Sequence, residues 1–253
     1  MRFDDLDRRL RVYETAHDHC VLPGLHIVTR LDGRNFSRLT ADLGLAKPFD
    51  ATFRDHMVTT TRQVMQCGLR VLYGYTQSDE ISLLLHRDED AFGRKERKLN
   101  SILAGEASAA LALALGRPCA FDCRVAQLPS LDVVVDYFRW RQEDAHRNAL
   151  NGHCYWLLRR QGQSEQQAHA ALLGKSVRAK HELLFTHGVN YNDLPTWQKR
   201  GVGIYWERYE RPGYNPYAAV ATVATRTRLT ADLELPMRAQ YDAFLRDLLA
   251  PTQ

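Results

Sequence analysis

Two short segments of the sequence place acidic residues where an apolar run meets a turn. The first segment ends in Asp32-Gly33, and the second is Ser78-Asp79-Glu80. Carboxylates held at a sheet edge can bind a divalent cation together with a phosphate group. Each segment alone is equally typical of an ordinary turn. The chemistry therefore depends on whether the two segments converge.

The oxygen atoms of these segments match the preferences of Mg²⁺. Asp32, Asp79 and the backbone carbonyl of Gly33 are hard oxygen ligands, and Gly33 has no Cβ to keep the backbone away from an ion. Two Mg²⁺ ions about 3.5–4 Å apart activate an attacking hydroxyl and stabilise the leaving oxygen in phosphoryl transfer. If they meet, the two acids predict a catalytic two-metal site.

The hydrophobic pattern of the first half predicts four strands and two long helices. Strands are expected at 25–31, 69–75, 81–85 and 121–125, and helices at 53–68 and 90–116. This β-α-β-β-α-β order is the ferredoxin-like arrangement of the α+β class. Its first and third strands are antiparallel neighbours, so it predicts that Asp32 and Asp79 meet at one edge of the sheet.

The second half predicts a helical lobe followed by a hairpin. Ser130 is expected to cap a helix, Ser164 begins a capping box, and a further helix reaches Gly188. Strands are expected at 202–206 and 219–229 around a turn at 211–216, and the tail from Pro236 is expected to be helical. We expect a catalytic core at 1–129 and a lobe at 130–253; a single integrated domain is the alternative.

Composition excludes several classes of protein. The chain has 253 residues, 45% of them hydrophobic, and a net charge of +4, so it can fill a core and is not disordered. Without a signal segment or a long apolar run, we expect a soluble, cytoplasmic protein with no membrane partner. Five scattered cysteines favour reduced thiols; a zinc site at Cys119/Cys123 or His17-His19-Cys20 lacks further ligands nearby.

Basic residues recur near the expected helix starts and through the middle of the chain. Lys47 precedes the first helix, and Arg94, Lys95 and Lys98 lie at the start of the second, where cations and free backbone N–H groups favour a triphosphate. Further clusters such as Arg139-Trp140-Arg141 combine charge with aromatic rings, as RNA-binding surfaces do. A solvated helix face is the alternative for each cluster.

Six motifs, in this order, resemble the histidine-tRNA guanylyltransferases and their bacterial and archaeal guanylyltransferase-like relatives. They are Arg30-Leu31-Asp32-Gly33-Arg34-Asn35-Phe36, Ala46-Lys47-Pro48-Phe49-Asp50, Gln77-Ser78-Asp79-Glu80, Phe121-Asp122-Cys123-Arg124, Asp136-Tyr137-Phe138-Arg139-Trp140-Arg141 and Gly188-Val189-Asn190-Tyr191-Asn192. The resemblance spans about residues 5–210. It implies a polymerase-type palm that adds nucleotides to the 5′ end of tRNA in the 3′-to-5′ direction.

The resemblance also implies roles for individual residues. Asp32 and Asp79 would be catalytic and, with Gly33, would bind two Mg²⁺ ions. Eleven residues would bind the substrates ATP and GTP or other nucleoside triphosphates: Arg30, Gly33, Arg34, Asn35, Phe36, Lys47, Asp50, Ser78, Arg94, Lys95 and Lys98. Contacts with tRNA are implied for Arg124, Arg139, Arg141, His146, Asn148, Lys199 and Arg200. The resemblance further implies a homo-oligomer, a tetramer with tRNA crossing its subunits.

Two departures from the family pattern select a branch. Gly152 replaces the final asparagine of a His-Ile-Asn-Asn-Leu-Tyr-Asn segment, and Phe49 stands where asparagine usually follows Lys-Pro. They favour the guanylyltransferase-like branch, so we expect template-dependent repair of tRNA 5′ ends after ATP-dependent activation. The alternative is addition of guanosine at position −1 of histidine tRNA. A non-catalytic tRNA-binding protein and a nucleotidyl cyclase are more distant alternatives.

Overall fold

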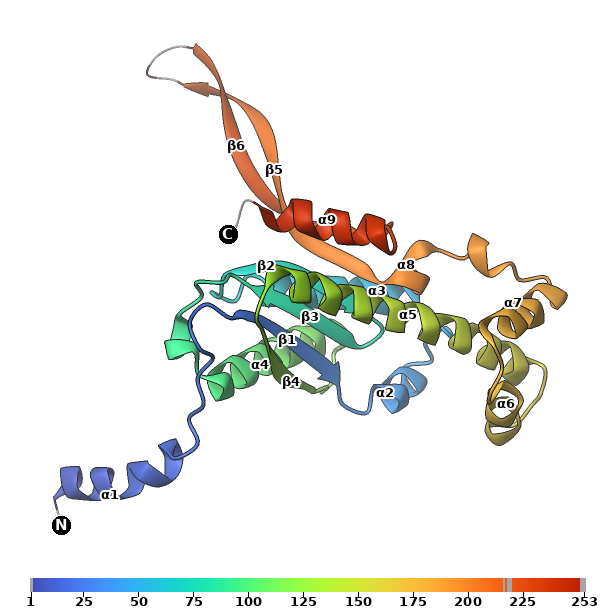
Figure 1. Ribbon diagram of the computed structural model, residues 1–253, viewed down its shortest axis with the longest axis horizontal. Helices are drawn as coiled ribbons and strands as arrows, with labels where there is room; N and C mark the ends of the chain where they lie inside the picture. Colours follow the sequence, from blue (N-terminus) through green and yellow to red (C-terminus); the bar gives the residue numbers. More distant parts are fainter. Residues whose placement is uncertain (1, 216, 218–219, 251–253) are drawn as a thin grey trace.

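A six-stranded antiparallel sheet forms the centre of the protein, shown by a computed structural model that describes residues 2–215, 217 and 220–250 (Figure 1). The strand order is β4-β1-β3-β2-β5-β6. The strands are β1 (His26–Gly33), β2 (Val71–Gln77), β3 (Glu80–Leu85), β4 (Phe121–Leu128), β5 (Val202–Asn215) and β6 (Val220–Asp232).

Helices cover both faces of this sheet, and others form the lobe beside it. They are α1 (Phe3–Thr15), α2 (Phe36–Asp42), α3 (Ala51–Val64), α4 (Glu96–Leu115), α5 (Leu131–Arg160), α6 (Glu165–Leu172), α7 (Val177–Thr186), α8 (Thr196–Arg200) and α9 (Ala239–Leu249), with 3₁₀ turns η1 (Ala91–Arg94) and η2 (Tyr191–Asp193). Within the described residues, none of them is both long and apolar enough to cross a membrane.

The central strand β1 is buried on both faces, which explains its nearly continuous apolar sequence. Ile27 and Leu31 pack in the core formed with α3 and α4, whereas Val28 packs with α5 and α9 on the other face. The side chains alternate because successive residues of a strand point to opposite faces. Asp32 therefore belongs to the α5 face, together with Val28.

The mixed helix and sheet class is confirmed, and so is the predicted antiparallel pairing of the first and third strands. The boundaries of the first four strands shift by at most three residues; β2, for example, is Val71–Gln77 where 69–75 was expected. The second long helix is preceded by the separate 3₁₀ turn η1, so α4 begins at Glu96 and not at Asp90.

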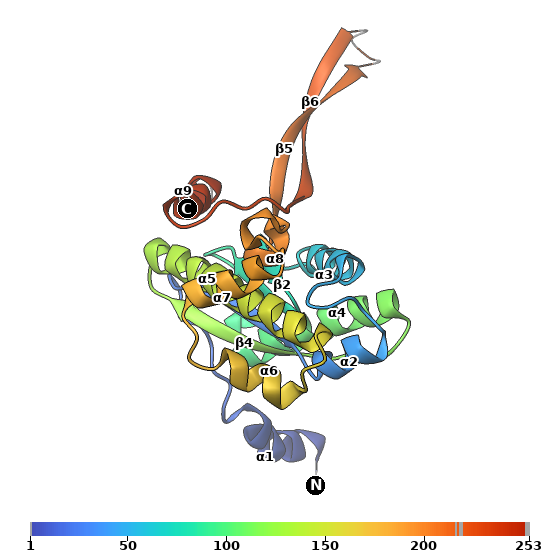
Figure 2. The ribbon, with the colours of Figure 1, turned by 90° about the vertical axis from the view of Figure 1, so that its right-hand side faces the viewer.

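The predicted turn at 211–216 is wrong for residues 211–215, which continue strand β5. Pro212 pairs in register with Val223 of β6. Beyond Tyr205, β5 pairs with β6 alone, so a proline without an N–H group is tolerated there as on an edge strand. Pro216 and Ala219, at the predicted turn and strand start, lie outside the described residues. Figure 2 shows the long β5–β6 ribbon projecting from the sheet.

Arg94 is buried in η1, with 8% of its surface exposed, so its guanidinium is not free for the predicted contact with a nucleotide. Its guanidinium donates to the carbonyl oxygens of Val21, Leu22, Leu25, Arg87 and Glu89. All five N–H groups of an arginine are thereby used. Arg94 instead fixes the segment that enters β1, at the end of that strand remote from Asp32.

We expect Arg94→Met to destabilise the fold by about 3 kcal/mol, because it leaves buried carbonyl groups without donors. Urea unfolding monitored by circular dichroism measures the change. Lys98→Met is the matched control, because Lys98 is exposed one turn further along the chain. Its effect should stay within about 0.5 kcal/mol. Equal stability of the two variants would contradict the structural role of Arg94.

Candidate functional site

The two predicted acids come together at one edge of the sheet. The backbone N–H of Gly33 donates to the carbonyl oxygen of Asp79, with 3.1 Å between the nitrogen and the oxygen. Asp32 lies opposite Glu80 in the β1–β3 register, so Asp79 lies one residue further toward the turn. The predicted convergence of the two segments is thus present in the structure.

Glycine is required at position 33 because of the ring that follows it. A Cβ added to Gly33 would lie 2.6 Å from atoms of the Phe36 ring, closer than real Cβ contacts. Phe36 is buried and packs edge-on against Phe121 of β4 and Phe53 of α3. The ring therefore supports the turn that carries Asp32 and leaves the backbone of Gly33 uncovered by a side chain of its own.

Asp79 is held at the β2–β3 turn in an environment that disfavours its charge. Ser78 has a positive φ of 54°, and its hydroxyl donates to Asp79 Oδ1 at 3.0 Å. Burial raises the pKa of Asp79, and the negative charges of Asp32 and Glu80 add to the shift. A cation bound beside this carboxylate would relieve the repulsion.

Three carboxylates lie side by side across the sheet. Asp122 of β4 is directly opposite Asp32, which is directly opposite Glu80 of β3. Directly opposed residues of antiparallel strands have Cβ atoms about 4.5–5.5 Å apart on one face. Asp122 belongs to one of the six motifs but was not predicted as a site residue. Its signal was available, because pairing the alternating strand at 121–125 with β1 brings Asp122 beside Asp32.

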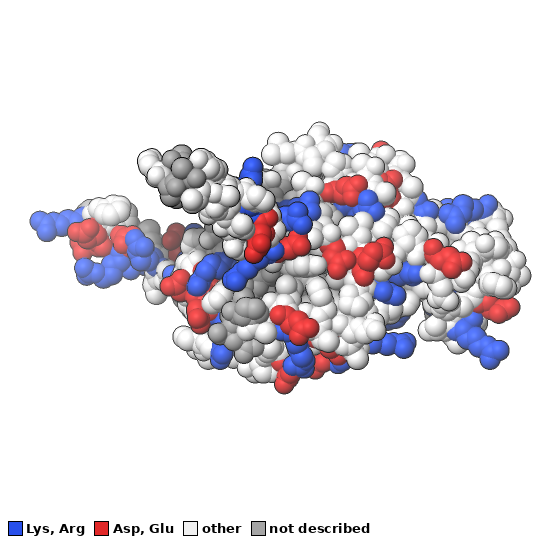
Figure 3. Space-filling view, turned by 90° about the horizontal axis from the view of Figure 1, so that it is seen from above, with Lys and Arg blue, Asp and Glu red and all other residues white. Residues whose placement is uncertain are grey.

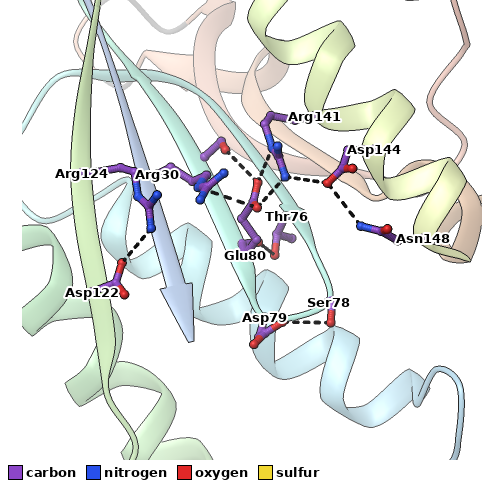
Figure 4. A network of polar contacts seen from close by, with 11 residues as sticks. Arg30, Thr76, Ser78, Asp79, Glu80, Asp122, Arg124, Arg141, Asp144 and Asn148 are labelled. Carbon is purple, nitrogen blue, oxygen red and sulfur yellow. Dashed lines mark hydrogen bonds and ion pairs between the residues drawn. The ribbon is translucent and has the colours of Figure 1, made fainter. Parts of the chain in front are cut away.

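Glu80 is occupied by an ion pair and is not free to bind a cation. Arg141 of α5 donates to both of its carboxylate oxygens, at 2.7 and 2.8 Å, and also to Asp144 at 3.1 Å (Figure 4). Only 8% of the Arg141 surface is exposed. The guanidinium of Arg141 is therefore not free for the predicted contact with RNA, because it joins α5 to the sheet.

A pair of arginines lies on the same strands as Asp32 and Asp122, two residues further from the edge that carries the acids. Arg30 and Arg124 are directly opposite each other in the β1–β4 register. Arg30 Nε is 3.9 Å from Glu80 and Arg124 is 3.6 Å from Asp122, so neither makes a close ion pair. Like charges placed directly opposite each other destabilise a sheet. An anion such as a phosphate would offset this repulsion.

A cavity of about 540 Å³ opens beside Asp79. Its walls come from α2, α3, the loop between them, and the α5–α6 region. Lys47 contributes a half-buried ammonium group that donates to Thr40 Oγ1 at 2.6 Å. Burial lowers the pKa of Lys47, while Asp50 and Asp79 oppose that shift. Apolar and aromatic residues line much of the rest: Phe36, Leu45, Phe53, Met57, Tyr155, Trp156 and Trp197.

A second cavity of about 340 Å³ lies between the acid pair and α5. It is polar, and Asp32, Asp79, Asp144 and Asn148 are among its lining residues. Asn148 donates its amide to Asp144 at 3.2 Å. Asp79 lines both cavities, of which the larger suits an apolar ring with a charged tail and the smaller suits polar groups.

The other predicted nucleotide residues fall into two groups. Asp50 caps α3 by accepting from Phe53 N at 2.9 Å, which lowers its pKa, and it lines the larger cavity. Arg34 and Asn35 are exposed at the turn after Gly33. Lys95 instead pairs with Asp18 at 2.9 Å near the start of β1, far from the acids. Lys98 is exposed in the first turn of α4, just after Lys95.

The predicted RNA-binding residues do not form one patch. Lys199 is buried and donates to Asn192 O at 2.6 Å, so it does not offer a free cation, and Arg200 binds Leu235 O at 2.8 Å. Arg139 pairs with Asp136 and Asp242. His146 stacks on Tyr191, with 5.4 Å between ring centroids. Figure 3 shows both signs of charge interspersed over one face of the molecule.

The site fits a divalent cation through its chemistry and not through a closed cage of ligands. No group of three His, Cys, Asp or Glu side chains within the described residues is arranged to hold a metal ion. Asp32 and Asp79 supply two hard carboxylates, and burial, with the neighbouring charges of Asp32 and Glu80, raises the pKa of Asp79. A set of this kind is completed by water and substrate phosphates, as Mg²⁺ sites in phosphoryl-transfer enzymes are.

Comparisons with known proteins agree with this geometry. Residues 7–129 match the family model described as tRNAHis guanylyltransferase, and residues 132–238 match that of the Thg1 C terminal domain. The chain is 30% identical over 243 residues to a probable tRNA(His) guanylyltransferase of Mus musculus, covering 88% of this chain and 80% of the relative.

Two solved structures of a bacterial tRNA(His) guanylyltransferase (Thg1)-like protein match nearly the whole chain. The complex with GTP has a TM-score of 0.76 and 28% identity, covering 97% of this chain and 99% of that one. The complex with ATP has a TM-score of 0.75 and 28% identity, covering 96% and 98%. The resemblance found in the sequence motifs is confirmed. The chain belongs to the tRNA(His) guanylyltransferase family of nucleotidyltransferases.

Proposed function

We propose that this protein transfers a guanosine nucleotide to the 5′ end of histidine tRNA. The observation that carries the proposal is the hydrogen bond that places Asp32 and Asp79 together beside the cavity containing Lys47. The GTP-bound and ATP-bound bacterial relatives support nucleoside triphosphates as substrates. The curated relative's name supports histidine tRNA and guanosine as the pair.

The proposed reaction divides the site by chemistry. A nucleotide base would lie among the apolar rings of the larger cavity, with its triphosphate directed toward Lys47 and Ser78. The 3′-hydroxyl of that nucleotide attacks the phosphorus at the activated tRNA 5′ end, loses its proton, and displaces AMP or pyrophosphate. Arg30 and Arg124 lie where they would attract the phosphates of the second substrate.

Mg²⁺ is part of this proposal. Asp32, Asp79 and the carbonyl of Gly33 would hold two ions, which when bound make the attacking hydroxyl more acidic and neutralise the leaving group. Asp122 is a further carboxylate directly opposite Asp32. Glu80 would act indirectly, since its pairing with Arg141 fixes the β2–β3 turn against α5.

We also propose a finer division of the fold into a catalytic palm and a second lobe. The order of β1 to β4 and the helices between them supports a ferredoxin-like palm of the polymerase type. The boundary expected between 129 and 130 is supported by the two family models, since the first ends at residue 129 and the second begins at residue 132. We further propose that exposed cations such as Arg124 and Arg147 contact tRNA, and that tRNA spans subunits of a homotetramer.

A second candidate is template-dependent repair of tRNA 5′ ends. Gly152 of α5 lines the polar cavity beside Asp32 and Asp79, and the nearest atom to a Cβ built there is Pro48 Cβ at 3.5 Å. This distance is an ordinary van der Waals contact, so a side chain would fit at position 152. Because residue 152 is glycine, the space that a longer side chain would fill stays part of the cavity. The extra room favours a terminal nucleotide already paired with a template.

The activity is tested by incubating the protein with ATP, Mg²⁺, labelled GTP and histidine tRNA that lacks nucleotide −1. We expect a product longer by one nucleotide, and a loss of at least about 100-fold in rate for Asp32→Asn and Asp79→Asn, because each removes a charge from the reacting centre. Arg94→Lys serves as a control for damage to the fold. Extension at the normal rate by either aspartate variant would contradict the proposed site.

The two candidate functions differ in their need for base pairing. Guanosine addition to histidine tRNA predicts extension whether or not residue 73 pairs with guanosine, whereas repair predicts extension only of matched ends. For repair, we expect Gly152→Asn to slow matched addition roughly tenfold by filling the polar cavity, while Gly152→Ala should be tolerated. Repair would be rejected if the protein added nucleotides to matched and unmatched ends at equal rates and if Gly152→Asn left these rates unchanged.

The raised pKa of Asp79 predicts a stability change that does not depend on activity. The folded protein binds this proton more tightly than the unfolded chain, so the ionised carboxylate destabilises the fold above the folded-state pKa. At pH 7 in EDTA, Asp79→Asn should therefore raise the melting temperature, by about 2–4 °C for each kcal/mol. This gain should vanish below the ordinary pKa of 3.8, where aspartate is protonated in both states.

Mg²⁺ with GTP should reduce the difference between wild type and Asp79→Asn at pH 7, because only the wild type gains from cation binding. Asp247→Asn is the matched control, since Asp247 is exposed on α9. A lower melting temperature of Asp79→Asn than of wild type in EDTA at pH 7 would show that the carboxylate is not strained.

A further inference from the structure

Helix α1 carries an apolar stripe that nothing else in the described chain covers. Figures 1 and 2 show α1 apart from the sheet and its helices, and no residue of α1 is buried. The exposed fractions along the stripe are 79% for Phe3, 39% for Leu6, 48% for Leu10 and 80% for Tyr13. A helix of 13 residues without packing is marginally stable in water. The stripe therefore requires a partner.

The spacing of the stripe is that of a coiled coil. Phe3, Leu6, Leu10 and Tyr13 are separated by three, four and three residues, which are alternating a and d positions of a heptad. An ordinary surface helix of a globular domain shows a wider apolar face that includes e or g positions. Here those flanking positions are charged, so the apolar contact is a narrow seam suited to another helix.

The charges beside the seam determine the partner and its direction. The e positions are Asp7 and Glu14, and the g positions are Arg9 and, just before the helix, Arg2. In a parallel pair of identical helices, each g residue lies near the e residue of the next heptad of its partner. Arg2 then faces Asp7 and Arg9 faces Glu14 of the second copy. An antiparallel pair would place e against e and g against g, which repel.

We propose that α1 forms a parallel two-stranded coiled coil with α1 of a second copy of this chain. Asp7 also pairs with Arg11 of its own helix at 2.6 Å, which leaves the a and d seam clear. Residues 2–15 contain four arginines and four acidic residues, so α1 has no basic surplus that would favour an anionic membrane. Figure 3 shows the two signs side by side on α1.

The connection to the rest of the chain allows this arrangement. Asp18, just after α1, is bound by Lys95 and Arg97 at the start of α4, and Val21 N donates to Arg94 O at 3.0 Å. The chain between α1 and β1 is thus fixed to the body within a few residues of the helix. Two copies joined through α1 would hold their bodies side by side, and this inference does not depend on the reaction proposed above.

Cysteine cross-linking tests the pairing directly. The parent is Cys20→Ser, because Cys20 is exposed near the helix. In a parallel coiled coil Leu10 lies against Leu10 of the partner, so Leu10→Cys should give roughly tenfold more disulfide dimer under mild oxidation than Arg8→Cys, whose position f faces solvent. Circular dichroism and thermal melting of each variant establish that the fold is retained.

Two outcomes would overturn the proposal. One is a yield for Leu10→Cys no higher than for Arg8→Cys, which would mean that another surface covers the seam. The other is cross-linking only between Leu6→Cys and Leu10→Cys in a mixture, which would show antiparallel helices.

A charge exchange tests the direction of the helices independently. In the Leu10→Cys background, Arg9→Glu should lower the dimer yield by roughly threefold to tenfold at low salt, because two attractive pairs become repulsive. Adding Glu14→Arg should restore the yield, and Arg8→Glu is the matched control at position f. A loss with Arg9→Glu that Glu14→Arg does not restore would contradict the parallel register.

Discussion

The hydrogen bond from Gly33 N–H to the carbonyl of Asp79 is the contact on which the site depends. It closes the end of β1 onto the β2–β3 turn and so converts two separate turns into one pair of acids. The contact requires glycine, since the ring of Phe36 occupies the space of a Cβ at this position. The same ring joins the turn to β4 and α3, so the position of the acids is set by the core of the domain.

Adjacent residues on this turn have opposite electrostatic environments. Burial raises the pKa of Asp79, whereas Glu80 next to it accepts two close hydrogen bonds from Arg141. A buried carboxylate is stable when a guanidinium binds it and strained when none does. In the proposed reaction, a cation and a substrate phosphate would relieve this strain at Asp79.

The sequence predicted the convergence of Asp32 and Asp79 because strand order alone makes β1 and β3 neighbours. Prediction from the sequence failed where the hydrogen-bond partners of a side chain are backbone groups far away along the chain. Arg94 belongs to a basic run that resembles a helix surface, yet its acceptors are carbonyls at 21–25 and 87–89 that only the tertiary fold collects. Arg141 differs, since its partners are the side-chain carboxylates of Glu80 and Asp144, and Lys199 donates to the nearby carbonyl of Asn192. The turn expected at Pro212 was wrong because β5 has an open edge there.

The central claim is that Asp32 and Asp79 form one cation site and not two neighbouring ones. Electron paramagnetic resonance of Mn²⁺ bound in the presence of GTP tests it most directly, using Asp32→Asn, Asp79→Asn and the double variant. We predict that each single substitution weakens the binding of both Mn²⁺ ions and that the double variant loses no further ion, because the two ions share both carboxylates. Independent, additive losses from the two substitutions would contradict a shared site.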